Sequence, residues 1–285
     1  VSVVNDELVN TMIEEVSKNS LDEKQTLSAK VLKAIVDTEP NKIEVINNEI
    51  TDIMIEQTIE SAKNQEEGIG IQENENLTDI VSDIIVNIDT ETAAKIIEEV
   101  NDTETLSNLS LKVISGISEK DSNTLQTLIS NDKNQMDVLT ENAIQKAENT
   151  TEDSELIAKV VSAANEELVN KVVDEVSKIS TDEKQTLSAK VLKAIVDVEP
   201  SKIETISGEI KDTIIKQTIE SAKDQKEGNL QDEEDLSDFV AEIIVKTDTE
   251  TASKVIEEIN DTETDTNLSL DVMSGVSNKD ENKIN

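Results

Sequence analysis

The stretch IVSDIIVNIDTETAAKIIEEV, residues 80–100, carries the pattern that decides the fold. Its first half places isoleucines at intervals that fall on one face of an α-helix, namely Ile80, Ile84, Ile85 and Ile88. Asp89 follows where the N-cap of a second helix is expected, because a short side chain with an acceptor oxygen can bond free backbone N–H groups there. The stretch therefore predicts two short helices joined by a tight turn.

The same two-helix pattern recurs along the chain at irregular intervals. Copies begin near residues 27, 80, 109, 156, 187, 239 and 268. In three of them we expect the cap of the second helix to be Asp37, Ser118 or Asn165. Pro40 and Pro200 fall in the first turn of a second helix, where proline is tolerated because its missing N–H would have no helical partner. Period-two alternation is absent, so the pattern favours helices over strands.

A larger repeat encloses these copies. The segment DEKQTLSAKVLKAIVD stands unchanged at 22–37 and at 182–197. The similarity continues on both sides at an offset of 160, and at 159 after a polar loop that is one residue shorter in its second occurrence. We therefore expect a tandem duplication with repeat units at 1–160 and 161–285. Both ends of the chain cut through helical patterns, so we expect truncated units from a longer repeating polypeptide.

The polar loops at 64–76 and 224–235 are acidic and contain glycine, which predicts flexible joints. The segment before the first loop, residues 42–63, has no internal breaker. It is predicted to form one long helix that braces the hairpins, with Pro40 before it and the Gly68/Gly70 loop after it.

A single helical hairpin has too little apolar surface to be stable alone, and stacking of neighbours buries a continuous apolar strip. We predict an all-α chain in which tandem helical hairpins stack as an elongated α-solenoid-like rod. The layout is similar to that of HEAT-like α-solenoids, with no specific family motif. The alternative is an elongated antiparallel helical bundle. Heptads are not sustained, which disfavours a coiled coil.

The amino-acid composition excludes most kinds of catalytic site. The 285 residues include no Cys, His, Trp or Tyr and a single Phe, and all 26 basic residues are lysines. The commonest general base, the thiolate ligands and the bidentate phosphate clamp are therefore absent. We predict that the chain is not an enzyme and has no catalytic or cofactor-binding residues.

The formal net charge of −38 predicts which partners the chain avoids. Nucleic acids and anionic membrane surfaces are repelled, because both are bound mainly through lysine and arginine. No run of 18 apolar residues exists, so we expect no membrane insertion. A basic protein partner and divalent cations would both relieve the charge.

Two acidic clusters are candidates for a cation site. In DTETDTN (261–267), Asp261, Glu263 and Asp265 stand at alternate positions, as at the start of an EF-hand loop. Thr266 stands where that loop needs glycine, and Val272 where it needs glutamate. A capped turn is the simpler interpretation.

The second cluster is DEED in the loop at 224–235, composed of Asp232, Glu233, Glu234 and Asp235. Its counterpart ENEN carries only two acids, which favours a solvated charge run. At most we predict a weak association with Ca²⁺ or Mg²⁺. Lys30 and Lys190, which lie mid-helix, are interpreted as lysines that extend along apolar surface, in preference to buried nucleophiles.

Long near-identical repeats, strong acidity and the lack of reactive side chains favour a structural role. We expect a surface stalk, spacer or filament subunit that joins neighbouring repeats or copies of the same chain. The alternatives are a protein-binding α-solenoid scaffold for a basic partner and a divalent-cation-responsive extracellular module. The expected location is extracellular or at the cell surface, with a cytoplasmic location as the alternative.

Overall fold

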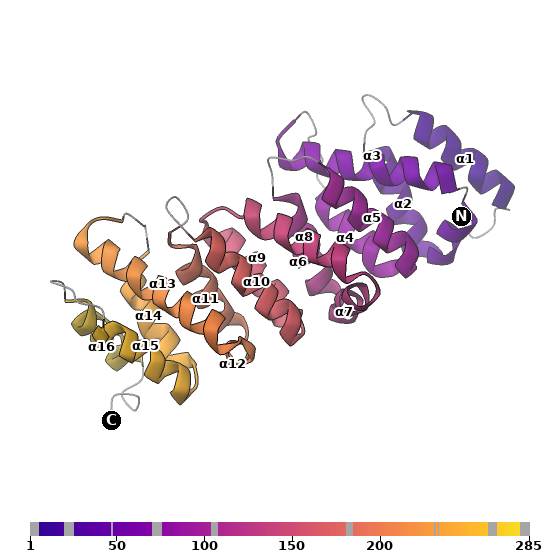
Figure 1. The fold of residues 1–285 in the computed structure, drawn as a ribbon. Coiled ribbons are helices and arrows are strands. Elements are labelled where there is room, and N and C mark those ends of the chain that lie inside the picture. Colours follow the sequence, from indigo (N-terminus) through magenta and orange to yellow (C-terminus); the bar gives the residue numbers. More distant parts are fainter. Residues whose placement is uncertain are drawn as a thin grey trace. The chain divides into compact units, whose positions relative to one another are not determined.

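The computed structural model describes most of the chain as α-helix (Figure 1). The residues that it describes are 6–19, 26–46, 48–69, 76–103, 108–180, 185–230, 232, 234–261 and 267–279. Within these ranges there are sixteen α-helices, one 3₁₀ helix and no strand. The predicted all-α class is confirmed.

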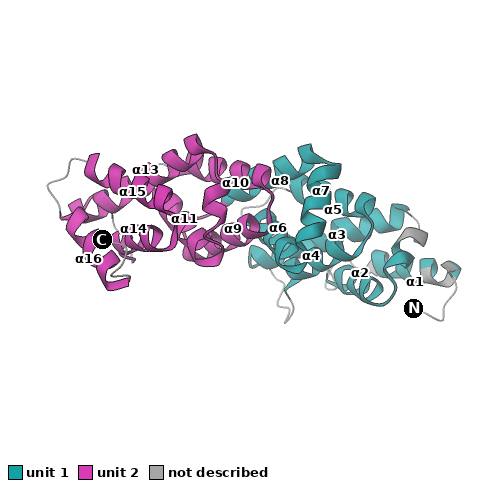
Figure 2. Ribbon diagram, turned by 90° about the horizontal axis from the view of Figure 1, so that it is seen from below, with its two compact units in different colours: residues 1–146 teal, residues 147–285 magenta. Residues whose placement is uncertain are grey.

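The chain divides into two compact units, residues 1–146 and 147–285, which Figure 2 shows in different colours. The predicted repeat units, 1–160 and 161–285, are frames of sequence similarity, and the boundary between them lies inside one helix of unit 2, Thr151–Ala163.

Unit 1 is a two-layered stack of helices. Helices α2, α4, α6 and α8 pack against one another in succession and form one layer. Helices α1, α3, α5 and α7 do the same in the second layer, which packs on the first. The bounds are α1 Asp6–Asn19, α2 Leu27–Thr38, η1 Pro40–Val45, α3 Asn48–Glu66, α4 Leu77–Asn87, α5 Thr90–Asp102, α6 Leu109–Lys120, α7 Ser122–Asn131 and α8 Lys133–Lys146.

Unit 2 has the same two-layered design. Helices α9, α11, α14 and α16 pack in succession, and α10, α13 and α15 form the second layer. The bounds are α9 Thr151–Ala163, α10 Glu166–Ile179, α11 Leu187–Val198, α12 Lys202–Thr205, α13 Gly208–Glu227, α14 Leu236–Lys246, α15 Thr249–Asp261 and α16 Leu268–Lys279. Stacked helical hairpins, as predicted, therefore build each unit.

Two of the predicted helix caps are confirmed and two are wrong. Asp89 accepts a hydrogen bond from the Thr92 backbone N–H, and Asn165 caps α10 in the same way. Ser118 instead lies inside α6, and its buried hydroxyl donates to the Ile114 carbonyl. Asp37 lies inside α2. Its carboxylate pairs with a lysine one turn earlier in the same helix, so it is not available as a cap.

The predicted long helix over 42–63 is interrupted. Pro40 begins the 3₁₀ helix η1, as its place in a first turn predicts, and the chain then becomes extended at the buried Ile46 before α3 begins. In unit 2, the side chain of Asn170 holds the equivalent break by accepting from Ser207 N–H (2.7 Å) and donating to the Thr205 carbonyl (3.2 Å). The helix breaks because burial of an isoleucine and the hydrogen bonds of a side chain replace the regular backbone hydrogen bonds of a helix there.

Both long helices of the second layer end at a glycine. Gly68 and Gly228 have φ values of 69° and 78°, in the left-handed region that favours glycine. The predicted end of the first long helix is therefore confirmed. Residues 70–75, 231 and 233 of the two polar loops lie outside the described residues, and the flexibility of these loops stays a prediction.

Candidate functional site

The acidic candidates are distributed over two places in unit 2. Glu233, Glu263 and Asp265 lie outside the described residues. Asp261 is the last residue of α15 and is exposed. Among the residues that the structure describes, no group of three or more acidic side chains is placed to hold a metal ion. The expected weak cation association stays a prediction.

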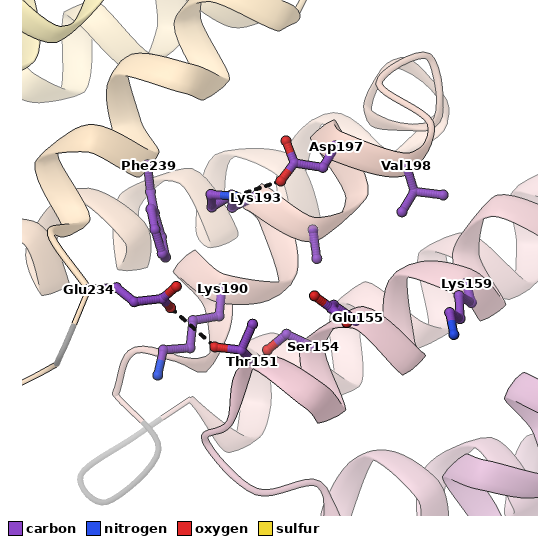
Figure 3. A pocket seen from close by; sticks show the side chains of 11 residues that line it. Thr151, Ser154, Glu155, Lys159, Lys190, Lys193, Asp197, Val198, Glu234 and Phe239 are labelled. Carbon is purple, nitrogen blue, oxygen red and sulfur yellow. Dashed lines mark hydrogen bonds and ion pairs between the residues drawn. The ribbon is translucent and has the colours of Figure 1, made fainter.

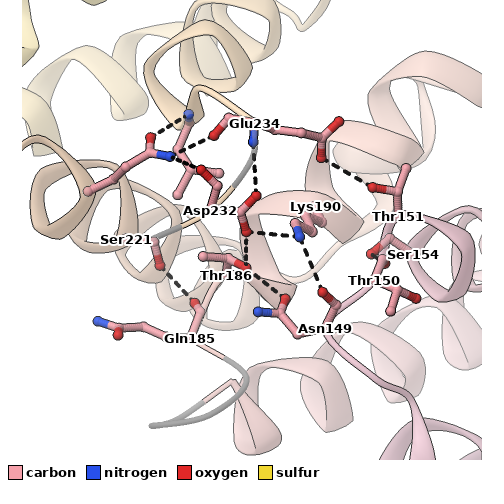
Figure 4. A network of polar contacts seen from close by, with 12 residues as sticks. Asn149, Thr150, Thr151, Ser154, Gln185, Thr186, Lys190, Ser221, Asp232 and Glu234 are labelled. Carbon is pink, nitrogen blue, oxygen red and sulfur yellow. Dashed lines mark hydrogen bonds and ion pairs between the residues drawn. The ribbon is translucent and has the colours of Figure 1, made fainter. Parts of the chain in front are cut away.

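Asp232 is instead the centre of a buried polar network (Figure 4). Its carboxylate lies 2.9 Å from the ammonium of Lys190, and the two side chains are only 7% and 10% exposed. The hydroxyl of Thr186 lies 3.0 Å from the same carboxylate and 2.7 Å from the Asn149 side-chain oxygen. Lys190 also donates to the Asn149 carbonyl (3.2 Å). The pair thus joins the α13–α14 loop to α11 and to the start of α9.

The residues after Asp232 complete the same junction. Glu234 donates its backbone N–H to the Asp232 carboxylate (3.1 Å) and accepts from the Thr151 hydroxyl (3.2 Å). Asp235 is the N-cap of α14 and accepts from the Ser237 backbone N–H (3.0 Å). Gln225, near the end of α13, donates to the Glu234 carbonyl (2.6 Å). The acidic residues 232–235 therefore connect the end of α13 to the start of α14.

Burial and pairing act in opposite directions on these carboxylates. Burial alone would raise the pKa of Asp232, but bonds from Lys190, the Glu234 backbone and Thr186 outweigh it and hold the pKa below its ordinary value. The pKa of Asp235 is also lowered, because bonds from Ser237 outweigh a smaller degree of burial. Both groups therefore stay ionised well below neutral pH.

A cleft of about 190 Å³ lies beside this network, between α9, α11 and α14 (Figure 3). Its lining combines three lysines and three carboxylates with apolar residues that include Phe239, the one phenylalanine of the chain. The lining residues are Thr151, Ser154, Glu155, Lys159, Lys190, Lys193, Ala194, Asp197, Val198, Glu234 and Phe239.

The lysine above the aromatic ring belongs to a second ion-pair network. The Lys193 ammonium lies 5.2 Å from the centre of the Phe239 ring and 2.6 Å from the Asp197 carboxylate. Lys246 bridges Asp197 (2.5 Å) and Glu242 (2.8 Å). Burial works to lower the pKa of Lys193, but the neighbouring carboxylates outweigh it and raise the pKa above its ordinary value.

The hydrogen bonds and ion pairs of the cleft residues are made to other parts of the protein itself. Ser154 donates its hydroxyl to the Thr150 carbonyl one turn earlier, and Lys190 is held between a carboxylate and a carbonyl. The contacts of Lys190 therefore connect α11 to the start of α9 and to the α13–α14 loop. The comparable lysine of unit 1, Lys30, lies on an exposed position.

Sequence reasoning missed a pair of partly buried glutamines. Gln57 of α3 accepts from the Ser28 hydroxyl (2.6 Å) and donates to the Ser17 carbonyl (2.9 Å). Gln217 of α13 makes the same two bonds, with Ser188 (2.7 Å) and with the Ser177 carbonyl (2.8 Å). We call each of these arrangements a glutamine brace. The signal was present in QTIESAK, which occurs unchanged at both places.

No protein-family model matches the chain, and a comparison with curated proteins finds no similar sequence. Within the described residues, no helix combines the length and the apolar character needed to cross a lipid bilayer.

Proposed function

We propose that this chain is a non-catalytic structural segment of a large tandem-repeat protein, and that it serves as a stalk, spacer or filament subunit at a cell surface or outside the cell. The observation that carries the proposal is the duplicated glutamine brace. A repeat that preserves these structural bonds, while its acidic clusters differ between copies, is selected for its architecture.

Stacked helical hairpins suit this role physically. Each hairpin contacts only its neighbours, so a further repeat adds length and stability in similar increments. The strong negative charge of the chain keeps such a segment soluble and disfavours collapse of one part onto another.

Small-angle X-ray scattering tests the proposal directly. A compact globule of 285 residues has a radius of gyration of about 19 Å, and a spacer should clearly exceed this value. A longer chain, made by appending residues 127–285 after Asn285, keeps the repeat in register. We expect its maximum dimension to increase nearly in proportion to its length. A radius near the globular value, for both chains, would contradict the proposal.

A second candidate function, a scaffold for a basic partner, is favoured by like charges on α3 and α5. Burial and repulsion from Glu56, Asp102 and Glu98 raise the pKa of Glu99, and a cationic partner would relieve this repulsion. The counterpart of Glu56 in unit 2 is Lys216, so this candidate applies to unit 1. Loss of binding to a lysine-rich peptide in the Glu99→Gln variant, but not in Glu258→Gln, would support it.

A further inference from the structure

Within the described residues of unit 2, no further helix covers an apolar face formed by α14, α15 and α16. The face contains a cavity of about 270 Å³, and we call this surface the terminal face. Its lining residues are Ile244, Ile256, Ile259, Asn260, Ser269, Val272, Met273 and Val276. Most of these side chains are apolar, although the chain is rich in charged residues. The exposed apolar side chains at this cavity, Ile256 and Met273, together with the neighbouring Leu270, indicate an interaction site.

The internal duplication identifies the equivalent surface in unit 1. At the offset of 159, each residue of the terminal face has a counterpart on α4, α5 or α6. The counterparts are Ile85, Ile97, Val100, Asn101, Ser110, Val113, Ile114 and Ile117. Five of the eight positions are occupied by the same residue type in both units, and the other three exchange one apolar residue for another. The two surfaces are therefore chemically equivalent.

The equivalent surface of unit 1 is covered by another pair of helices. Helix α8 packs on α5 and α6, and α7 contacts the same two helices. Asn101 of α5 donates its side-chain N–H to the Gln135 carbonyl of α8 (3.1 Å). The hairpin α7–α8 thus covers in unit 1 the surface that no described residue of unit 2 covers.

The exposed fractions of equivalent side chains in the two units show which residues a covering hairpin would bury. Met273 is 49% exposed, whereas its counterpart Ile114 is 1% exposed. Ile256 is 41% exposed and Ile97 is 1% exposed. Leu270, beside the cavity, is 66% exposed, whereas its counterpart in α6 is fully buried. Covering these side chains would remove a large apolar area from water, which is the main favourable contribution to such contacts.

We propose that the terminal face is a docking site for a helical hairpin of the α7–α8 type, supplied by a further repeat of this sequence. The inference rests on the proposed function in taking that repeat as the partner. The occupant presents an apolar stripe equivalent to the buried residues of α7 and α8, which include Leu125, Leu128, Met136, Leu139 and Ile144. Repeats would thus join through a contact that unit 1 already contains.

The test adds a peptide of residues 121–146 to the unaltered 285-residue chain and measures binding by calorimetry and amide hydrogen exchange. We expect saturable 1:1 binding that slows exchange of α16 amides by at least tenfold. Met273→Asp in the chain is expected to weaken binding by at least tenfold, and this variant should fold because Met273 is half exposed. A peptide carrying Leu139→Asp is the matched control and should not bind.

An isolated hairpin is only marginally helical, so a second arm attaches it covalently. Residues 280–285 are replaced by residues 121–146, in the register in which α6 continues into α7. Protection of α16 in this chain, and its loss with Leu139→Asp in the graft, supports the proposal even where the free peptide binds too weakly to detect. Unprotected α16 amides in the graft overturn it.

Equal binding of an unrelated amphipathic hairpin also overturns the proposal, because the face would then be unselective. Failure of the docking test leaves the scattering of the 285-residue chain unchanged. Conversely, a globular scattering profile would contradict the spacer function without affecting hairpin binding. The two experiments therefore distinguish failure of the docking proposal from failure of the proposed function.

Discussion

Gly275 shows how a single residue sets the distance between two helices. A β-carbon at this position of α16 would lie 2.7 Å from the β-carbon of Ala241 in α14, closer than real carbon atoms approach. Gly116 holds the equivalent place in α6, where Ser82 of α4 is the close neighbour. Glycine is therefore retained in both copies for close packing, despite its low helix propensity.

We expect Gly275→Ala to lower the free energy of unfolding by about 1–3 kcal/mol, because the added methyl group forces α14 and α16 apart. Urea unfolding followed by circular dichroism measures this loss. Gly208→Ala is the matched control. The first residue of α13 has open space around a β-carbon, so this variant should be neutral or slightly stabilising. Equal effects of the two substitutions would contradict the packing argument.

The buried pair of Lys190 and Asp232 gives a second prediction at this scale. Asp232→Ala should cost about 3 kcal/mol, because it leaves a buried ammonium without its carboxylate. The double variant with Lys190→Met should recover much of that loss, since no uncompensated charge remains. Lys30→Met, at the exposed equivalent position, should change stability by less than about 0.5 kcal/mol. Additive single effects in this cycle would argue against a coupled pair.

The same pair has a pH dependence whose sign follows from the lowered pKa of Asp232. Its ionised form is favoured by folding, so the stabilisation is present above the ordinary aspartate pKa of about 4. It is lost as the pH falls through the lower pKa of the folded state. The stability difference between the parent chain and Asp232→Ala should therefore shrink between pH 5 and about pH 2. A difference that is constant over this range would be incompatible with an ionised pair.

At the scale of helices, the glutamine brace fixes three elements at once. Gln217 joins α13 to α11 and to the end of α10, and Gln57 does the same for α3, α2 and α1. We expect Gln57→Leu and Gln217→Leu each to cost about 1–3 kcal/mol, because each leaves a buried carbonyl without its donor. Hydrogen exchange should show the loss only in the unit that carries the change. Gln126→Leu, on an exposed face of α7, is the control.

Helix positions were predictable where the apolar period and the cap agree, as in residues 80–100. The caps at Asp37 and Ser118 were not, because each residue bonds within the preceding helix instead. The break at Ile46 was also missed. An isoleucine carries no local stop signal, and only its burial against the neighbouring helices makes the extended backbone favourable there.

The candidate site was less predictable than the fold. Lys30 and Lys190 stand in identical sixteen-residue contexts, yet one is exposed and the other is buried against Asp232. Lys190 is covered by the start of α9 and by the α13–α14 loop, which are distant in sequence. The residues next to Lys190 in the sequence do not indicate these partners. The acidic pattern of the loop by itself predicts a solvated charge run.

For the whole molecule, the net charge of −38 predicts a strong effect of salt. Added NaCl should raise the melting midpoint, because screening reduces repulsion among carboxylates in the folded state. Melting curves in CaCl₂ at matched ionic strength separate screening from specific binding. Equal midpoints would exclude the cation-responsive alternative, and a higher midpoint in CaCl₂ would support the predicted Ca²⁺ association. A midpoint that does not respond to NaCl would contradict the screening argument itself.

The duplicated glutamine brace also has a consequence for how the chain reaches its fold. Gln57 and Gln217 stand in the same local sequence, so nothing in the brace itself distinguishes Ser28 from Ser188 as the partner. On refolding from denaturant the two partners compete, which favours swapped topologies. During synthesis, Gln57 and Ser28 leave the ribosome before Ser188 has been made. We therefore expect the order of translation, as well as the sequence, to favour the correct pairing.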